Sequence, residues 1–262
     1  MKIALCVFPL FYEMSAALAA LKAYVREASA ARAELIVFPE TCLLGLELSG
    51  KVEDDRKLCL ETDSEEFRAI LSLAQEQRIK ICFGFLEYER GCIYDSAAFI
   101  SEGGKVLDIY RRISIGWMIP GVDEEHYLRG KSLSIIDLDG LKLSLLICGD
   151  LCEEELIAEL ESQNLDLCLH IMARSFEISK DINEIWDRDE LPFYTAEWKR
   201  LAKHCLCVNS VSPDLFLSET EYCGGAWIVN KAGDILASKR LLEQGLLICD
   251  LKTQRSAEQI RG

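Results

Sequence analysis

Short apolar runs recur along the chain and are separated by segments that contain turn residues and charged residues. The clearest run, 141–147, ends at Cys148 and is followed by Gly149 and Asp150. A short apolar run bounded by turn residues is typical of a buried strand. Segments with apolar residues at helical spacing alternate with these runs, at 15–31, 62–77, 153–162 and 191–204. We therefore expect an α/β fold in which helices cover the outer faces of layered sheets.

The expected strands span most of the chain and outnumber the helices. They are 2–7, 34–38, 80–87, 93–101, 106–110, 132–138, 141–147, 165–172, 205–211, 224–230, 235–238 and 245–250. Two long segments, 113–131 and 173–190, show no clear period, and loops of this length inside a domain usually carry function. Because no repeat or linker interrupts the pattern, we expect one domain over 1–262.

Composition excludes several classes of function. The net charge is −15, from 29 basic and 44 acidic residues, which argues against binding to nucleic acid or to anionic membranes. No apolar segment is long enough to span a bilayer, and no signal peptide is visible. The twelve cysteines form no paired framework, which indicates reduced thiols in the cytoplasm. With three histidines and no repeated cysteine pair, we expect neither a metal site nor a cofactor.

Three of the expected strands end at reactive side chains, which are Glu40, Arg112 and Cys148. The carboxyl ends of strands are the usual place for chemistry in sheets layered with helices. Cys148 lies where a strand meets a helix N-terminus, a position that lowers the pKa of a thiol. Each residue also has a structural alternative. Cys148 is then one more buried cysteine, Glu40 an exposed loop acid, and Arg112 a surface ion-pair partner, for which Arg111 is equally eligible.

Several motifs in order give the chain a family resemblance. They are IVFPE at 36–40, YRRI at 110–113, LICGD at 146–150, VNS at 208–210 and GGAWIV at 224–229. Together they resemble the nitrilase superfamily of carbon–nitrogen hydrolases. The resemblance implies a four-layer α-β-β-α sandwich that assembles as a homodimer or higher homo-oligomer. It also implies a Glu–Lys–Cys centre that acts on a small amide or nitrile.

Carried over position by position, the resemblance assigns a role to each strand end. Glu40 is the general base and Cys148 the nucleophile, while Arg112 fills the lysine position. A second glutamate of the family, in the loop before the next strand, corresponds to Glu124, although Asp123 and Glu125 lie within one residue of it. We therefore place Glu124 and Gly149 as substrate-binding candidates. Asp150 is expected to be a structural cap rather than a catalyst.

The chemistry agrees with these residue types without the family. Amide hydrolysis needs a nucleophile, a base for its proton and positive charge beside the developing oxyanion. Cys148 supplies the sulfur, Glu40 the base, and Arg112 with the backbone N–H of Gly149 the oxyanion contacts. The hypothesis is thiol-dependent hydrolysis of a small amide, less readily of a nitrile, through an acyl intermediate on Cys148.

Two alternatives stay open. One is a catalytically impaired relative that acts as a ligand-binding or scaffold homo-oligomer; Arg112 favours it, and the presence of both Glu40 and Cys148 opposes it. The other is a thiol redox protein, which the number of cysteines suggests and the absence of a Cys-x-x-Cys motif opposes.

Overall fold

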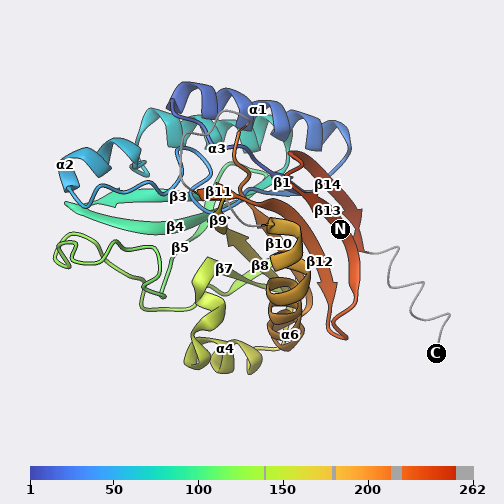
Figure 1. Cartoon of the computed structure of the whole chain (residues 1–262). Coiled ribbons are helices and arrows are strands. Elements are labelled where there is room, and N and C mark those ends of the chain that lie inside the picture. The colour runs from blue at the N-terminus through green and yellow to red at the C-terminus, as the bar shows by residue number, and fades with distance from the viewer. Residues whose placement is uncertain (139, 179–180, 214–219, 252–262) are drawn as a thin grey trace, which may run out of the picture.

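Two six-stranded sheets face each other in the computed structural model, which describes residues 1–138, 140–178, 181–213 and 220–251 (Figure 1). In spatial order the first sheet contains β14 (Gly245–Asp250), β1 (Lys2–Val7), β2 (Leu35–Val37), β3 (Lys80–Glu89), β4 (Cys92–Ile100) and β5 (Val106–Arg111). The second contains β13 (Ile235–Leu241), β12 (Gly224–Asn230), β10 (Ala202–Asn209), β8 (Leu165–Met172), β7 (Leu141–Ile147) and β6 (Ile136–Leu138). A separate pair joins β9 (Ser175–Glu177) to β11 (Thr220–Tyr222).

Helices cover the outer face of each sheet (Figure 1). The helices α1 (Met14–Ala30) and α3 (Glu65–Gln77) pack on the first sheet, and α4 (Glu154–Glu161) and α6 (Leu191–Leu201) pack on the second. Two short helices, α2 (Val52–Asp55) and α5 (Ile182–Ile185), lie in the connections. The fold is therefore the four-layer α-β-β-α sandwich that the sequence predicts.

The strands read as continuous apolar runs because both of their faces are buried. On β1, Leu5 and Val7 point into the core between the sheets, while Ala4 and Cys6 pack beneath the helices. A further core lies between the second sheet and its helices. Complete burial of one leucine or valine side chain contributes about 1.5–3 kcal/mol, so the three cores hold the four layers together.

Local sequence signals explain where α3 begins and ends. Ser64 caps the helix, because its hydroxyl accepts a hydrogen bond from the Phe67 N–H at 3.1 Å. The helix stops at Arg78, which adopts a left-handed conformation with φ of 51°. The helix predicted over 62–77 is therefore confirmed as α3, which begins three residues later, at Glu65.

Three expectations about the connections need correction. The predicted strand 132–138 begins only at Ile136. The predicted loop 173–190 contains β9, α5 and a π-helical turn, η3 (Trp186–Glu190), while its residues 179 and 180 lie outside the described part. The predicted helix 191–204 ends at Leu201, and β10 begins directly after it. Each error falls where contacts distant in sequence decide the local structure, as in the pairing of β9 with β11.

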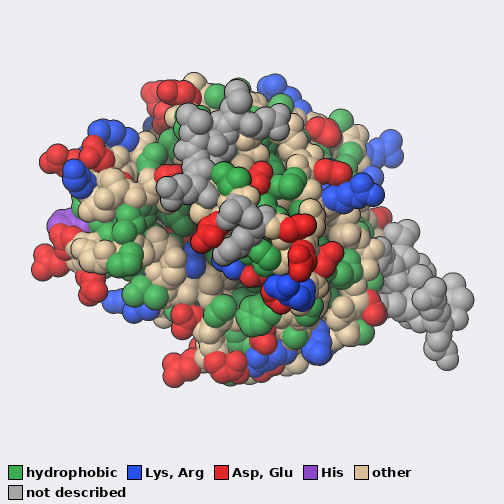
Figure 2. Space-filling model, in the orientation of Figure 1, with side chains coloured by type: hydrophobic (Ala, Val, Ile, Leu, Met, Phe, Trp, Pro, Cys, Tyr) green, Lys and Arg blue, Asp and Glu red, His purple; other side chains and the backbone are tan. Residues whose placement is uncertain are grey.

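The surface carries both signs of charge. Figure 2 shows acidic and basic side chains interspersed over the face in view, among apolar patches. In the part of the chain that the structure describes, we find no helix that is both long enough and apolar enough to cross a bilayer.

Candidate active site

Strand ends from both sheets meet at one place. Glu40 follows β2 and Arg112 follows β5 in the first sheet, while Cys148 follows β7 and Ala173 follows β8 in the second. Arg112 Nη1 donates a hydrogen bond to Glu40 Oε1 at 2.7 Å. The charges of these two residues act on the Cys148 thiol, so the structure brings Glu40, Arg112 and Cys148 together.

Glu40 is fully buried and is held on both carboxylate oxygens. Oε1 accepts the hydrogen bond from Arg112, and Oε2 accepts one from the Ala173 N–H at 2.5 Å. Beneath it, Gly84 of β3 approaches so closely that a Cβ there would lie 2.6 Å from the Glu40 Cα. A side chain at position 84 would therefore displace Glu40, and the sheet itself fixes the position of this carboxylate.

Arg112 is 4% exposed, and polar side chains hold one side of its guanidinium. Nε donates to Ser114 Oγ at 2.7 Å, and Nη1 also donates to Asp95 Oδ2 at 3.3 Å. Nη2 lies against Gly149, where a Cβ would be only 2.6 Å away. Within the described part of the chain, no side chain accepts a hydrogen bond from Nη2. The arginine therefore keeps donors for a ligand.

The electrostatics keep Arg112 charged. Burial lowers the pKa of the guanidinium, but the neighbouring acidic groups of Glu40, Cys148 and Asp95 outweigh burial, and the net shift is upward. An arginine side chain is in any case not deprotonated in a protein. Arg112 thus acts as a fixed positive charge and cannot carry a proton to or from a substrate.

Cys148 lies on a strained backbone, with φ of 44°, and is partly buried. Burial, and next the charge of Glu40, raise the pKa of its thiol, while Arg112 and the Ala173 N–H lower it; the net shift is upward. The expected lowering of the pKa by a helix N-terminus is therefore wrong. The helical turn η2 (Cys148–Cys152) is a single turn, and the loss of water outweighs it. The resting thiol is protonated and needs a base.

A buried histidine supports the strained backbone of Cys148. The Trp198 indole N–H, which is only a donor, bonds to His170 Nδ1 at 3.0 Å. His170 Nε2 must then carry the hydrogen and donate it to the Cys148 carbonyl oxygen at 2.8 Å. Burial lowers the pKa of His170 to about 4, so this histidine is neutral near pH 7. It positions Cys148 without adding charge to the site.

Asp150 has the structural role that the sequence predicts. Its Oδ1 accepts the backbone N–H groups of Ile113 at 3.0 Å and Ser114 at 2.8 Å. Its Oδ2 accepts the Tyr110 hydroxyl at 2.7 Å and the Ile147 N–H at 3.1 Å. Asp150 therefore joins the nucleophile turn to the end of β5, which carries Arg112.

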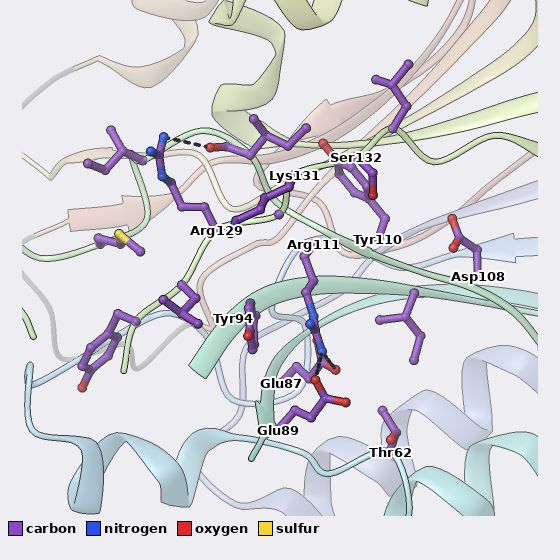
Figure 3. Close-up of a pocket in the computed structure, with 18 of the residues that line it drawn as sticks. Thr62, Glu87, Glu89, Tyr94, Asp108, Tyr110, Arg111, Arg129, Lys131 and Ser132 are labelled. Atoms are coloured by element: carbon purple, nitrogen blue, oxygen red, sulfur yellow. Dashed lines mark hydrogen bonds and ion pairs between the residues drawn. The ribbon is translucent and has the colours of Figure 1, made fainter. Parts of the chain in front are cut away.

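The structure does not bring Glu124 to the other predicted site residues. Glu124 is exposed and lines a cavity of about 860 Å³ whose wall contains neither Glu40, Arg112 nor Cys148 (Figure 3). The loop is held there because Ile93 N donates to His126 O at 2.7 Å. Asp123 and Glu125 are exposed on the same loop. Sequence spacing does not reveal the position of Glu124, because that position depends on how the loop pairs with β4.

Sequence reasoning missed four residues that contact the site, namely Asp95, Ser114, His170 and Ala173. Asp95 had a visible signal, since it is the one charged residue within the predicted strand 93–101. Ala173 contributes only a backbone N–H, so its side chain gives no signal. In the described part, no three His, Cys, Asp or Glu side chains are grouped to hold a metal ion, and we assign no metal ligands.

Comparisons with known proteins agree on one family. A family model described as carbon-nitrogen hydrolase matches residues 2–261. A glutamine-dependent NAD(+) synthetase of Acinetobacter baylyi is 24% identical over 210 residues, which cover 80% of this chain and 36% of that protein. A probable nitrilase of Schizosaccharomyces pombe is 26% identical over 219 residues, which cover 81% of this chain and 73% of that protein.

The fold comparison agrees with the sequence comparison. The crystal structure of a carbon-nitrogen hydrolase from Helicobacter pylori G27 superposes with a TM-score of 0.81 at 16% identity, and the match covers 99% of this chain and 92% of the other. At that identity the likeness shows the fold alone. The present chain spans about a third of the length of the NAD(+) synthetase that it matches.

Proposed function

Because the chain belongs to the carbon-nitrogen hydrolase family, we propose that it hydrolyses a small amide through a covalent acyl intermediate on Cys148. One observation carries the proposal. Glu40 and Arg112 are 2.7 Å apart at the ends of strands in one sheet, and both act on a thiol presented by the other sheet. A base, a fixed positive charge and a nucleophile are the groups that acyl transfer requires.

The first half of the reaction forms a thioester. Glu40 accepts the Cys148 thiol proton, and the thiolate attacks the amide carbon. The carbonyl π electrons move to oxygen, where Arg112 Nη2 and the Gly149 N–H stabilise the negative charge. Gly149 suits this role because backbone donors at the start of a helical turn have no partner within the turn. When the oxyanion collapses, the C–N bond breaks, and the nitrogen takes the proton from Glu40 and leaves as ammonia or an amine.

The second half returns the enzyme to its starting state. Glu40, again a carboxylate, accepts a proton from water, and the hydroxide attacks the thioester carbon. The C–S bond then breaks, the Cys148 sulfur regains a proton, and the acid product leaves. Arg112 never gives up a proton in this scheme. An arginine in the family's lysine position is therefore compatible with turnover, provided that the residue only has to supply a positive charge at the right distance from the oxyanion.

The choice of an amide rests on the leaving group and the relatives. In the proposed scheme Glu40 returns a proton to the departing nitrogen. Amide hydrolysis requires such a proton, because the nitrogen leaves as ammonia or an amine. The name of the Acinetobacter relative specifies glutamine, a carboxamide, whereas the name of the fission-yeast relative specifies a nitrilase. We therefore place glutamine and simple aliphatic amides first in a substrate panel and nitriles second.

Intact-mass spectrometry during turnover tests the proposal. The wild type and two matched variants, Cys148→Ala and Cys152→Ala, are mixed with each substrate and quenched in acid. Cys152 lies four residues away on the same turn and is exposed, so it controls for nonspecific acylation. We expect the mass of an acyl group on the wild type and on Cys152→Ala, and none on Cys148→Ala.

The alternative of a non-catalytic relative predicts another result. If no variant gains mass with any amide or nitrile while the protein still binds one of them in calorimetry, a ligand-binding role replaces hydrolysis. Assembly as a homodimer or higher homo-oligomer and location in the cytoplasm stay predictions. Light scattering of the purified protein measures the first, and fractionation of the source cells measures the second.

A further inference from the structure

Asp95 is a second buried carboxyl group beside Glu40, and the proposed reaction gives it no task. It lies on β4 at 1% exposure, and its Oδ2 is 3.3 Å from Arg112 Nη1. Its Oδ1 is buried without a hydrogen-bond partner. We propose that Asp95 holds a proton at neutral pH and donates it in a hydrogen bond to Glu40, so that one carboxylate and one carboxylic acid share the charge of Arg112.

The hydrogen bonds decide which of the two groups is ionised. Glu40 receives two short bonds, one on each oxygen, from Arg112 at 2.7 Å and from the Ala173 N–H at 2.5 Å. Asp95 receives a single longer bond from Arg112. Hydrogen bonds from donors favour the charged form of a carboxyl group. The negative charge therefore stays on Glu40, and the proton goes to Asp95.

The unpartnered oxygen has the same explanation. Two carboxylates cannot hydrogen-bond to each other, so an ionised Asp95 leaves its Oδ1 orphaned and repelled by Glu40. A proton on Asp95 turns that repulsion into a hydrogen bond, since the two side chains lie within hydrogen-bonding reach. Burial, and next the charge of Glu40, raise the pKa of Asp95 well above its usual range. Two interacting carboxyls commonly share one proton in this way.

Three strand ends bring titratable or charged side chains near Asp95. Glu40 comes from the end of β2, Arg112 from the end of β5, and Cys148 from the end of β7. With Asp95 neutral and the thiol protonated, Glu40 and Arg112 form one balanced pair of opposite charges beside Asp95. An ionised Asp95 leaves a net negative charge there, which is costly to bury.

The catalytic consequence rests on the proposed function. Asp95 contacts no reacting atom, so it is a positioning residue that sets the charge of the site. A negative Asp95 raises the pKa of Cys148 and opposes the thiolate. As pH rises and Asp95 loses its proton, kcat/KM therefore falls. The variant Asp95→Asn, which is neutral at every pH, should lack this alkaline fall.

The decisive measurement does not need a substrate. Infrared difference spectroscopy of the wild type at neutral pH should show the C=O stretch of a protonated carboxyl that shifts in heavy water and disappears in Asp95→Asn. The matched control is Asp55→Asn. Asp55 is as buried as Asp95 but accepts bonds on both oxygens, from Ser49 at 2.7 Å and Tyr127 at 2.6 Å. Its removal should leave the band unchanged.

A titration of the wild type keeps the test independent of how any variant folds. With carboxyl-labelled aspartate, one carbon resonance should keep the chemical shift of the acid form at neutral pH and move only in alkaline solution. Absence of that resonance and of the infrared band overturns the proposal, as does a folded Asp95→Asn that keeps the alkaline fall of kcat/KM. If the band is present and no amide is hydrolysed, Asp95 is protonated as proposed and only the proposed function fails.

Discussion

Arg111 and Arg112 are neighbours in sequence, yet they lie in two different regions of the molecule. Arg111 lines the cavity in Figure 3, where it forms a bidentate ion pair with Glu87 in which both N···O distances are 2.7 Å. It also pairs with Glu89 at 2.7 Å, and its guanidinium carbon lies 3.8 Å from the ring centre of Tyr94. Arg112 points between the sheets to Glu40 and Asp95.

The difference shows how a structural arginine is told from a functional one. Arg111 donates from Nε and Nη2 to two carboxylates and lies against an aromatic ring, and its side chain is 27% exposed to water. Arg112 is 4% exposed and still has Nη2 without an acceptor in the described part of the chain. Buried charge that is incompletely paired is costly, so a fold that keeps it indicates a task for it.

The largest expected effect comes from removing each arginine in turn. Arg112→Ala should lower kcat by about 10²–10³, the loss typical of one oxyanion donor. It should also destabilise the fold by about 3–5 kcal/mol, because Glu40 is left buried without its ion pair. Arg111→Ala should leave kcat/KM at the wild-type level. Steady-state kinetics and urea unfolding of both variants measure these effects. Equal activity losses in the two variants would show that the regions are not distinct.

The second test moves Arg112 without changing it. In Gly149→Ala the new Cβ would lie 2.6 Å from Arg112 Nη2 and 3.1 Å from Ser114 Oγ, so the guanidinium must shift. A shift of about 1 Å can cost about a hundredfold in rate, and we expect a loss of that size in kcat. Gly103→Ala is the control, because its nearest neighbour is the Ser101 hydroxyl at 3.8 Å. Wild-type kinetics in Gly149→Ala would exclude Nη2 as an oxyanion donor.

The third test compares a histidine of each region through the pH dependence of stability. The pKa of His170 falls from its usual 6.5 to about 4 in the folded protein. Below pH 6.5 the His170 imidazole therefore binds a proton in the unfolded chain but not in the folded chain. The free energy of unfolding consequently decreases as pH falls towards 4. The loss attributable to His170 should reach about 3 kcal/mol.

Urea unfolding across that pH range measures this loss in the wild type and in His170→Gln. Glutamine keeps an N–H donor but has no charge to gain, so its stability should fall less steeply. His126→Gln is the control, because His126 lies on the exposed loop beside the cavity. The assignment of a neutral His170 fails if the two glutamine variants have the same pH dependence.

The smallest effect is expected from Arg112→Lys. A lysine ammonium keeps the charge and can pair with Glu40, but it lacks the planar fork that reaches Ser114, Glu40 and Asp95 together. We expect kcat/KM to stay within about tenfold of wild type, in either direction, because charge rather than shape is the main requirement. The assay is the one used for Arg112→Ala. A complete loss in the lysine variant would show that the guanidinium fork itself is required.

The sequence predicted most of the fold because its signals are local. Apolar runs predicted strands buried on both faces, and apolar residues at helical spacing predicted the helix at 62–77. The segment 132–135 was misassigned because the side chains of Ser134 and Asp108 bond to each other there, whereas strand pairing begins at Ile136. Likewise, nothing near 175–177 indicates its pairing with 220–222.

The candidate site was predictable only in part. Glu40, Arg112 and Cys148 each follow a strand, and the carboxyl ends of parallel strands gather at one edge. Local patterns alone did not separate Arg111 from Arg112, because both faces of β5 carry apolar residues, Ile109 on one and Tyr110 on the other. Only the family resemblance selected Arg112. The neutral His170 and the Ala173 N–H depend on distances across the second sheet, which no local pattern encodes.

The two sheets contribute different halves of the site, and this division has a consequence for folding. Glu40, Asp95 and Arg112 belong to the first sheet, whereas Cys148 and Ala173 belong to the second. Either sheet can acquire its secondary structure without placing the thiol beside its base. During refolding from urea, hydrolytic activity should therefore return only with the docking of one sheet on the other. The rate at which activity returns then measures the rate of that docking step. The far-ultraviolet circular dichroism signal, which follows strand and helix formation, should recover faster than activity.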